Sequence, residues 1–202
     1  MKKIIFQKEE IIPSKIVCIG RNYVDHIKEL DNEMPKDMVI FNKPNSAISN
    51  KLEYFSEDTR YEGEICLLIK DNKIDAIAFG LDLTKANEQN YLKSKSLPWE
   101  RSKSFNGSAV LSEFVKLEDD ISKIRLELFI NDTLAQYGSY DLMMYKPTQM
   151  IEEINSFMTL EDGDVIMTGT PKGVGTYNLN DKFEGKIYID EKLVLEASWI
   201  VT

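Results

Sequence analysis

Short apolar runs, each ended by glycine or by polar residues, alternate with polar stretches along most of the chain. Runs of this length that are rich in β-branched residues are typical of buried strands. We therefore predict strands at residues 14–20, 38–41, 64–70, 74–83, 124–131 and 164–168. Residues 186–199 are predicted as a C-terminal hairpin that turns near Asp190 and Glu191.

Helical periodicity is confined to two segments. Residues 147–158 place Met150, Ile151, Ile154 and Phe157 at helical spacing, just after a proline that the first helical turn tolerates. Residues 84–94 form the second candidate helix, with Thr84 as its N-cap. Because strands outnumber helices and do not alternate regularly with them, the pattern predicts an α+β, mainly β fold with a mixed sheet.

Length and composition favour one domain. The 202 residues, 43% of them hydrophobic, are enough to bury a core and still form a pocket, and no repeat, low-complexity tract or linker interrupts them. We predict a single catalytic domain over residues 1–202. The N-terminus has too short an apolar run for a signal peptide, and no stretch approaches the roughly 20 apolar residues that span a bilayer. We therefore expect a cytoplasmic protein with no membrane partner.

The charge balance and the cysteines exclude several classes of site. Acidic residues outnumber basic ones by 34 to 25, giving a formal charge of −9, which opposes the basic stripe that nucleic acid requires. Cys18 and Cys66 lie far apart beside Val or Ile, so we predict reduced, partly buried thiols rather than a disulfide. With a single histidine, a structural zinc site is nearly excluded.

Two glutamates form the first candidate site. Glu62 and Glu64 lie two positions apart where the chain becomes strand-like, and the period of a strand sends both side chains to one face. Neighbouring carboxylates repel each other unless a cation lies between them, and Gly63 leaves room for close approach. The alternative is a solvated edge strand with two surface acids, because glutamates are usually exposed.

A third acid changes this interpretation. Asp82 ends the hydrophobic run of residues 77–81 and precedes the predicted helix. Three carboxylates without a cysteine or histidine companion suit a hard cation that takes oxygen ligands. If Glu62, Glu64 and Asp82 face one another, they would suit Mg²⁺, with Mn²⁺ or Ca²⁺ as alternatives, and the alternative of surface acids stays open. Their spacing is too wide for an EF-hand loop of about twelve residues.

The only histidine lies in a segment that could be helical. His26 and Glu29 would then share one helical face, where the carboxylate can orient the imidazole and raise its basicity. Such a pair is a minimal general base for activating water. The alternative is an ordinary surface histidine.

Residues 168–175 (TGTPKGVG) look like a phosphate loop but lack the order of a P-loop and the third glycine of a dinucleotide fingerprint. Nucleotide binding is therefore not supported. The alternative, a Gly/Pro turn between two strands, stays open. The chain also has no Gly-x-Ser-x-Gly elbow for a serine hydrolase.

Several segments keep a fixed order along nearly everything after residue 12. Together they resemble the fumarylacetoacetate hydrolase family, in particular its short single-domain branch of acylpyruvate hydrolases and oxaloacetate decarboxylases or tautomerases. The matching segments are GRNYVDHIKE at 20–29, FNKP at 41–44, YEGE at 61–64, LDLT at 81–84, Gln89, LPWERSKSF at 97–105, Asn131, Gln136 and TLEDGDVIMTGTPKGVG at 159–175.

The resemblance implies a role for each matched site residue. Metal ligation falls to Glu62, Glu64 and Asp82, and water activation to His26 with Glu29. Lys103 would contact the 2-oxo acid end or the developing enolate, and the further substrate contacts would be Arg21, Gln89 and Thr170. The family's fold is a mixed, partly opened β-roll, usually in homodimers. Residues 1–12 would then be an N-terminal extension, and residues 21–37 a mobile lid over the substrate.

The activity implied by the resemblance is metal-dependent cleavage of a C–C bond in an acylpyruvate, giving pyruvate and a carboxylic acid. Two alternatives remain: an oxaloacetate decarboxylase or tautomerase that uses the same site, and a metal-binding homologue without activity. The partner in the first two cases is a small keto acid. Ala86-Asn87 replaces an Arg-Asp pair that is frequent in the family, and that arginine could grip a substrate carboxylate; Asn106 departs from the pattern as well.

Overall fold

A mixed eight-stranded sheet forms the centre of the computed structural model, which describes residues 1–29 and 34–202. Its strand order is β4-β3-β14-β7-β8-β10-β5, and β11 pairs with β8 beside that path. The pairs β14–β3 and β10–β5 are parallel and the others antiparallel. The bounds are β3 Lys15–Gly20, β4 Val39–Pro44, β5 Ile48–Ser49, β7 Gly63–Lys70, β8 Lys73–Asp82, β10 Ala109–Leu111, β11 Val115–Lys116 and β14 Val165–Met167.

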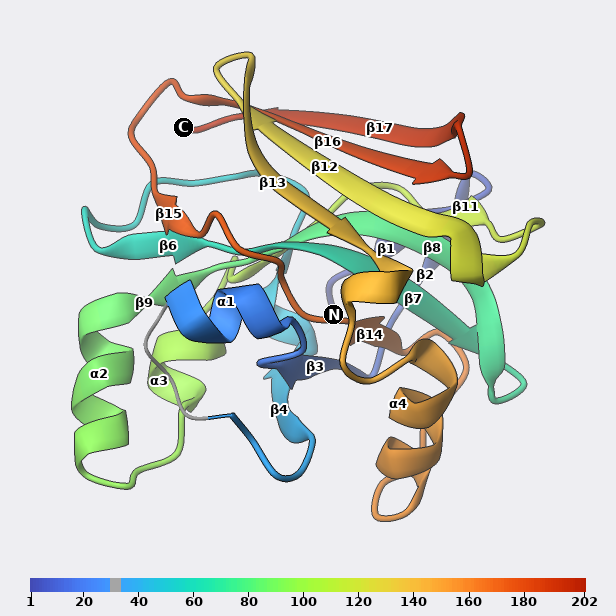
Figure 1. The fold of residues 1–202 in the computed structure, drawn as a ribbon, viewed down its shortest axis with the longest axis horizontal. Coiled ribbons are helices and arrows are strands. Elements are labelled where there is room, and N and C mark those ends of the chain that lie inside the picture. The colour runs from blue at the N-terminus through green and yellow to red at the C-terminus, as the bar shows by residue number, and fades with distance from the viewer. Residues whose placement is uncertain (30–33) are drawn as a thin grey trace.

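A second, antiparallel sheet covers one side of the first (Figure 1). Its order is β13-β12-β16-β17, with bounds Thr133–Ser139, Ile124–Ile130, Lys182–Ile189 and Lys192–Ile200. The main core lies between the two sheets, where buried Phe79 of β8 packs near Trp199 of β17 with their ring centroids 6.2 Å apart. This core gives β7 and β8 one of their two buried faces.

Two smaller sheets complete the strands. One is the N-terminal hairpin of β1 (Ile4–Phe6) and β2 (Glu9–Ile11). The other has the order β15-β6-β9, with bounds Gly175–Thr176, Thr59–Tyr61 and Thr84–Lys85. The predicted N-terminal extension therefore forms a hairpin, and its Ile4 is buried against the far face of the central sheet.

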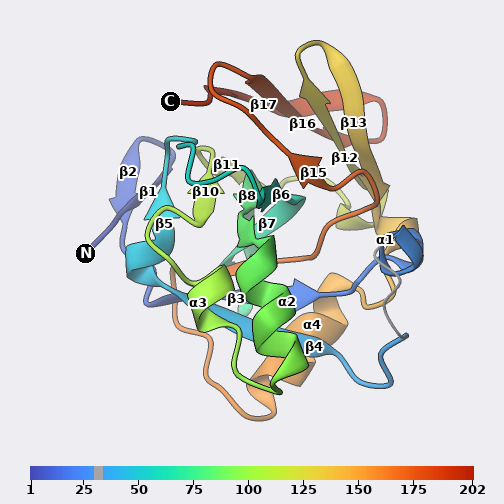
Figure 2. The same cartoon turned by 90° about the vertical axis from the view of Figure 1, so that its left-hand side faces the viewer.

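Of the described α-helices, the first lies near β13, since Val24 and Asp25 line a pocket with residues 134–137, and the others lie away from the second sheet (Figure 2). The helices are α1 Val24–Glu29, α2 Ala86–Ser94, α3 Glu100–Lys103 and α4 Pro147–Asn155, with short 3₁₀ turns at Asn45–Ala47, Ile121–Lys123 and Tyr140–Leu142. Met150 and Ile154 of α4 are fully buried, and Pro147 occupies the first turn as predicted. No helix among the described residues is long and apolar enough to cross a membrane.

The predicted fold class, mainly β with a mixed and partly opened sheet, is confirmed. The strand and hairpin predictions match β3, β4, β7, β8, β12, β14 and the pair β16–β17. Thr84 as an N-cap is wrong: Thr84 belongs to strand β9, and α2 begins at Ala86 with Lys85 in the N-cap position. Cys18 and Cys66 are free and buried. The lid predicted over residues 21–37 includes residues 30–33, which lie outside the described residues, and it stays a prediction.

Candidate active site

Three carboxylates meet on one face of the hairpin formed by β7 and β8. Glu64 pairs with Gly80 in the register, and the backbone of Asp82 donates to Glu62 O at 2.9 Å, so Glu62 lies opposite Asp82. Alternate residues of paired strands share a face, which places all three side chains together. One carboxylate oxygen from each lies within 4.8 Å of the others. We call Glu62, Glu64 and Asp82 the carboxylate triad.

The triad is buried rather than solvated. Glu64 is 2% exposed and Asp82 is 1% exposed, while the Glu62 side chain is 13% exposed. The alternative of two surface acids on an edge strand is therefore wrong. Asp82 Oδ1 is buried as well, and its contact is an ion pair with Lys43 rather than a hydrogen bond among the described residues.

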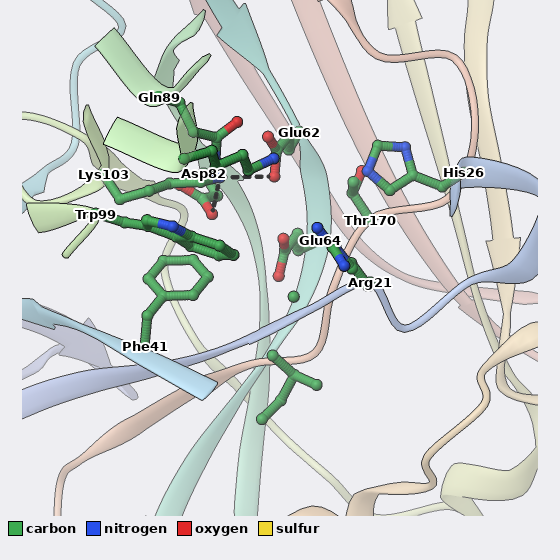
Figure 3. A pocket seen from close by; sticks show the side chains of 13 residues that line it. Arg21, His26, Phe41, Glu62, Glu64, Asp82, Gln89, Trp99, Lys103 and Thr170 are labelled. Carbon is green, nitrogen blue, oxygen red and sulfur yellow. Dashed lines mark hydrogen bonds and ion pairs between the residues drawn. The ribbon is translucent and has the colours of Figure 1, made fainter. Parts of the chain in front are cut away.

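Two lysines balance part of the negative charge. Lys103 Nζ lies 2.9 Å from Glu62 Oε2 and 2.8 Å from Asp82 Oδ2 (Figure 3). Lys43 Nζ forms a second ion pair, 2.8 Å from Asp82 Oδ1. Three carboxylates facing two cations leave the cluster one positive charge short, and a divalent ion would more than supply it.

Lys43 belongs to the FNKP segment that resembles the family, but the sequence alone assigned it no role. It is fully buried, and its Nζ also donates to the backbone carbonyl of Lys103 and to Ser108 Oγ. One side chain thus fixes both Asp82 and the end of α3 that carries Lys103. Strand alternation places Lys43 on the same face as Phe41, which lines the site, and this was the signal that could have revealed it.

The protonation of the triad reflects its crowding. Burial raises the pKa of Glu64 well above its usual value, and the charges of Asp82 and Glu62 raise it further. Burial acts in the same direction on Glu62, but Lys103 and then His26 outweigh it, so the pKa of Glu62 is lowered. The pKa values of the two glutamates are therefore shifted in opposite directions, an arrangement that is common at functional sites.

The glycine-rich loop after β14 contributes a backbone donor. Gly169 N donates to Glu64 Oε2 at 2.7 Å. Gly169 has φ +93°, and a Cβ there would lie 2.8 Å from Ile19 O, so this position requires glycine. The loop is a turn between strands, which was the alternative to a phosphate loop for residues 168–175. Its backbone also binds the carboxylate of Glu64.

Thr170 and Gln136 tie this loop to the triad strand. Gln136 Nε2 donates to Thr170 Oγ1 at 2.8 Å, and Gln136 Oε1 accepts from Gly63 N at 2.8 Å. Thr170 Oγ1 donates to Gly63 O at 3.0 Å. Both side chains are buried, so the backbone between Glu62 and Glu64 is held from the second sheet.

His26 and Glu29 lie on α1, as the conditional helix prediction required. His26 Nδ1 is 3.3 Å from Glu29 Oε2, and Glu29 Oε1 accepts from Gly173 N at 2.9 Å. His26 is 6% exposed, so the surface-histidine alternative is wrong. The carboxylate anchors the imidazole to the glycine-rich loop, and the ring enters the same cleft as the triad (Figure 3).

The predicted site residues converge on one cleft, with Glu29 just behind His26. The cleft is lined by Ile19, Gly20, Arg21, His26, Phe41, Glu62, Glu64, Asp82, Gln89, Lys93, Trp99, Lys103 and Thr170. Sequence reasoning assigned no role to Phe41, Lys93 or Trp99. In Figure 3 the rings of Phe41 and Trp99 form the wall on the Lys103 side, opposite His26 and Arg21. Their centroids are 5.9 Å apart.

The donor set fits a hard divalent cation. The triad offers only carboxylate oxygens, each able to accept from more than one direction, and oxygen ligands are those that Mg²⁺, Mn²⁺ and Ca²⁺ take in proteins. The two lysines that contact the triad occupy some of these oxygens, but each carboxylate keeps lone pairs for an ion.

Known sequences resemble this chain along most of its length. Residues 15–198 match the fumarylacetoacetate (FAA) hydrolase C-terminal family. The bovine mitochondrial oxaloacetate tautomerase FAHD1 is 34% identical over 191 residues, covering 86% of each chain. The mitochondrial oxaloacetate decarboxylase of Dictyostelium discoideum is 36% identical over 182 residues, covering 80% of this chain and 83% of its own.

Solved structures agree with the fold. A proposed fumarylacetoacetate isomerase/hydrolase from Oleispira antarctica superposes with a TM-score of 0.93 at 33% identity, covering 100% of both chains. A fumarylpyruvate hydrolase from Pseudomonas aeruginosa, solved with Mn²⁺ and pyruvate, superposes with a TM-score of 0.89 at 22% identity, covering 100% of this chain and 95% of its own. The second likeness concerns the fold alone.

Proposed function

This chain belongs to the fumarylacetoacetate hydrolase family, whose members are hydrolases, decarboxylases and isomerases acting on keto acids, and we propose that it is a divalent-metal-dependent enzyme for oxaloacetate. The proposed reaction forms the enol or enolate of the substrate, and it ends in tautomerisation or in loss of CO₂. The observation that carries the proposal is the buried carboxylate triad beside Lys103, in a cleft that also holds His26. The oxaloacetate enzymes of cow and Dictyostelium support the choice of substrate.

Glu62, Glu64 and Asp82 would hold the ion, which we propose to be Mg²⁺, with Mn²⁺ or Ca²⁺ as alternatives. When bound, it supplies a Lewis acid that polarises the 2-oxo group of the substrate. The triad residues themselves supply the oxygen ligands, and Lys43 and Lys103 together with the ion would offset their negative charge, so that the cleft can admit an anionic substrate.

Lys103 is suited to stabilise negative charge rather than to remove protons. Burial alone would lower its pKa, but Asp82 and Glu62 outweigh burial and raise the pKa of Lys103 above its usual value. Its ammonium group therefore stays protonated. A fixed cation in a water-poor cleft stabilises an oxygen that gains charge as the enolate forms.

His26 would carry the proton. When its Nδ1–H donates to Glu29 Oε2, the Nε2 atom is unprotonated and available as a base. In keto-to-enol tautomerisation it would take the proton from C3 of oxaloacetate and return one to the oxygen on C2 of the resulting enolate. Arg21, Gln89 and Thr170 line the cleft beside these groups and would orient the substrate.

Acylpyruvate hydrolysis is the second candidate, and the anchored His26–Glu29 pair favours it. The same base would then deprotonate a water that attacks the distal acyl carbonyl, and the C–C bond would break to give pyruvate and a carboxylic acid. Decarboxylation of oxaloacetate needs no such water, because the leaving group is CO₂ itself.

The test measures three activities of the purified chain: oxaloacetate tautomerisation, oxaloacetate decarboxylation and acetylpyruvate cleavage. Each is measured after treatment with EDTA and again after Mg²⁺ is restored. We expect turnover of oxaloacetate above the uncatalysed rate with Mg²⁺, and its loss after metal removal. Full activity in a thoroughly demetallated sample would remove the metal from the mechanism, and the absence of all three activities would favour a homologue without activity.

His26→Gln separates the candidate reactions, because glutamine keeps a polar side chain but cannot act as a base. We expect tautomerisation or hydrolysis to fall by about 10²–10⁴-fold. Decarboxylation should persist, since the enolate is formed by loss of CO₂. Wild-type rates of tautomerisation and hydrolysis in this variant would show that His26 is not the base.

We also propose a homodimer located in the cytoplasm, although the bovine and Dictyostelium relatives are mitochondrial. Light scattering of the purified chain would test the dimer. Fractionation of the source cells would test the location.

A further inference from the structure

One face of helix α2 is turned toward the cleft. Ala86, Gln89 and Lys93 follow each other at i, i+3 and i+7, which places them on the same side of the helix. Ala86 is buried, Gln89 and Lys93 are half-buried, and the last two line the cleft. Asn87 and Tyr91 on the other side are exposed. Lys93 is the only lysine or arginine within α2, so it is the one cation that this helix offers to the cleft.

Lys93 is a cation that pairs with none of the described carboxylates. Its Nζ lies 5.3 Å from the centroid of the Trp99 ring, and it makes no ion pair with any carboxylate in the described part of the chain. Burial lowers the pKa of Lys93, and the charges of Arg21 and Lys103 lower it further, against the opposite effect of Glu62. Holding this charge in the cleft is therefore costly, and a bound anion would offset the cost.

The two lysines of the cleft differ in what they contact. Lys103 is engaged by Glu62 and Asp82 at the triad, where the reacting end of a substrate would bind. Lys93 contacts an aromatic wall instead, one helical turn beyond Gln89, which is about 6 Å along the axis of α2. A cleft with one engaged and one unengaged lysine suits a ligand that has a second anionic group away from its reacting end.

We propose that Lys93 binds the far carboxylate of the substrate, so that the cleft selects 2-oxo acids with a second carboxylate over those with a neutral tail. This inference rests on the proposed function, because it assumes that the 2-oxo acid end binds at the triad. It gives the substrate class a physical basis in this chain: a charge-assisted contact from a half-buried ammonium is stronger than a neutral one. Ala86, nearer the start of the same helical face, supplies no such contact.

The first test compares turnover of a charged and a neutral substrate. Oxaloacetate and its 4-methyl ester differ only at the far carboxylate. Lys93→Met keeps the length of the side chain and removes its charge, Lys93→Arg restores a charge, and Lys95→Met removes an exposed lysine just after the same helix. We expect Lys93→Met to lower kcat/KM for oxaloacetate by about 10–100-fold, mainly through KM, and to leave the ester within about twofold. Lys93→Arg should recover part of the loss, and Lys95→Met should behave as wild type.

The second test does not require turnover. Calorimetry in the presence of Mg²⁺ compares 2-oxoglutarate with 2-oxopentanoate, which has a methyl group where 2-oxoglutarate has its far carboxylate. Wild type should bind 2-oxoglutarate more tightly, and Lys93→Met should abolish that preference. If this preference is found but no oxaloacetate turnover occurs, the inference stands and the proposed reaction is wrong. If oxaloacetate is turned over but Lys93→Met weakens both ligands equally, or neither, the inference is wrong.

Discussion

Among the described residues, carboxylates are buried in two places, and their surroundings are opposite. Asp164 is fully buried, and its Oδ1 accepts from Ser14 N at 3.0 Å, Ser14 Oγ at 2.7 Å and Lys15 N at 3.1 Å. Its Oδ2 accepts from Glu161 N at 2.9 Å and forms an ion pair with Lys15. Glu64 is buried to a similar degree, but it accepts one backbone bond, from Gly169, and faces two other carboxylates.

The pKa shifts of the two residues follow their partners rather than their burial. Burial would raise the pKa of Asp164, but hydrogen bonds from Lys15 and Ser14 outweigh it and the pKa is lowered. The pKa of Glu64 is raised. Asp164, just before β14, is surrounded by donors and therefore holds the fold together, whereas Glu64 in β7 faces two other carboxylates, whose repulsion a cation can relieve.

The largest expected effect comes from removing the charge of Glu64. Glu64→Gln keeps the shape of the side chain but removes one ligand charge and the repulsion from Glu62 and Asp82. We expect kcat with Mg²⁺ to fall by about 10³-fold, as for loss of a group that stabilises developing charge. The metal-free protein should unfold at the same temperature as wild type or at a higher one. Steady-state kinetics measures kcat, and a thermal melt measures the unfolding temperature. A large loss of stability would show that Glu64, like Asp164, stabilises the fold.

The matched change at the other site should have the converse effect. Asp164→Asn leaves Lys15 without its partner and brings an amide toward the donors of Ser14 and Glu161. We expect the free energy of unfolding to fall by about 2–4 kcal/mol, since half-buried Lys15 loses its charged partner and the amide cannot accept all the hydrogen bonds that Asp164 accepts. In urea titrations the midpoint should drop, while the activity of the folded fraction should stay near wild type. A selective loss of metal-dependent activity would overturn the distinction between the two sites.

Acid and alkali should act on the two sites in opposite senses. Because the pKa of folded Asp164 is depressed, its contribution to stability is present above its usual pKa of 3.8 and is lost as pH falls through the lowered value. The pKa of folded Glu64 is raised, so in the metal-free protein its contribution is present below the usual 4.5 and is lost as pH rises through the raised value. Stability curves against pH should therefore flatten on the acid side in Asp164→Asn and on the alkaline side in Glu64→Gln.

The smallest expected effect concerns a hydrogen bond that orients the triad. Thr84 Oγ1 donates to Glu62 Oε1 at 2.8 Å. Thr84→Val keeps the shape and removes the donor, which should weaken divalent-metal binding by about 3–10-fold, corresponding to a contribution of about 1 kcal/mol. Calorimetric titration of the variant with Mn²⁺ measures this. Affinity equal to wild type would show that metal binding does not depend on the hydrogen bond from Thr84 to Glu62.

The sequence predicted the strands well where burial is continuous. The runs at 64–70 and 74–83 became β7 and β8 because both faces of this hairpin are covered by core. Strand period alone placed Glu62 and Glu64 on one face. That Asp82 joins them depends on the register between the two strands, which the run lengths do not fix.

Residues whose roles come from distant contacts were missed. Lys43 reaches Asp82 and the carbonyl of Lys103 across 39 and 60 positions of chain, and Lys93 enters the cleft only because α2 lies beside it. Thr84 has the side chain of a good N-cap, but its hydroxyl donates to Glu62 instead. Its backbone belongs to β9, which pairs with β6. In each case a tertiary contact decided what local preference could not.

Direct titration with Mn²⁺, followed by the electron paramagnetic resonance of the free ion, tests the central claim that the triad binds one divalent cation. Wild type and Asp164→Asn should each take up one ion per chain near neutral pH, and Glu64→Gln should take up none at the same concentrations. Equal uptake by wild type and Glu64→Gln, or loss of uptake in folded Asp164→Asn, would contradict the account.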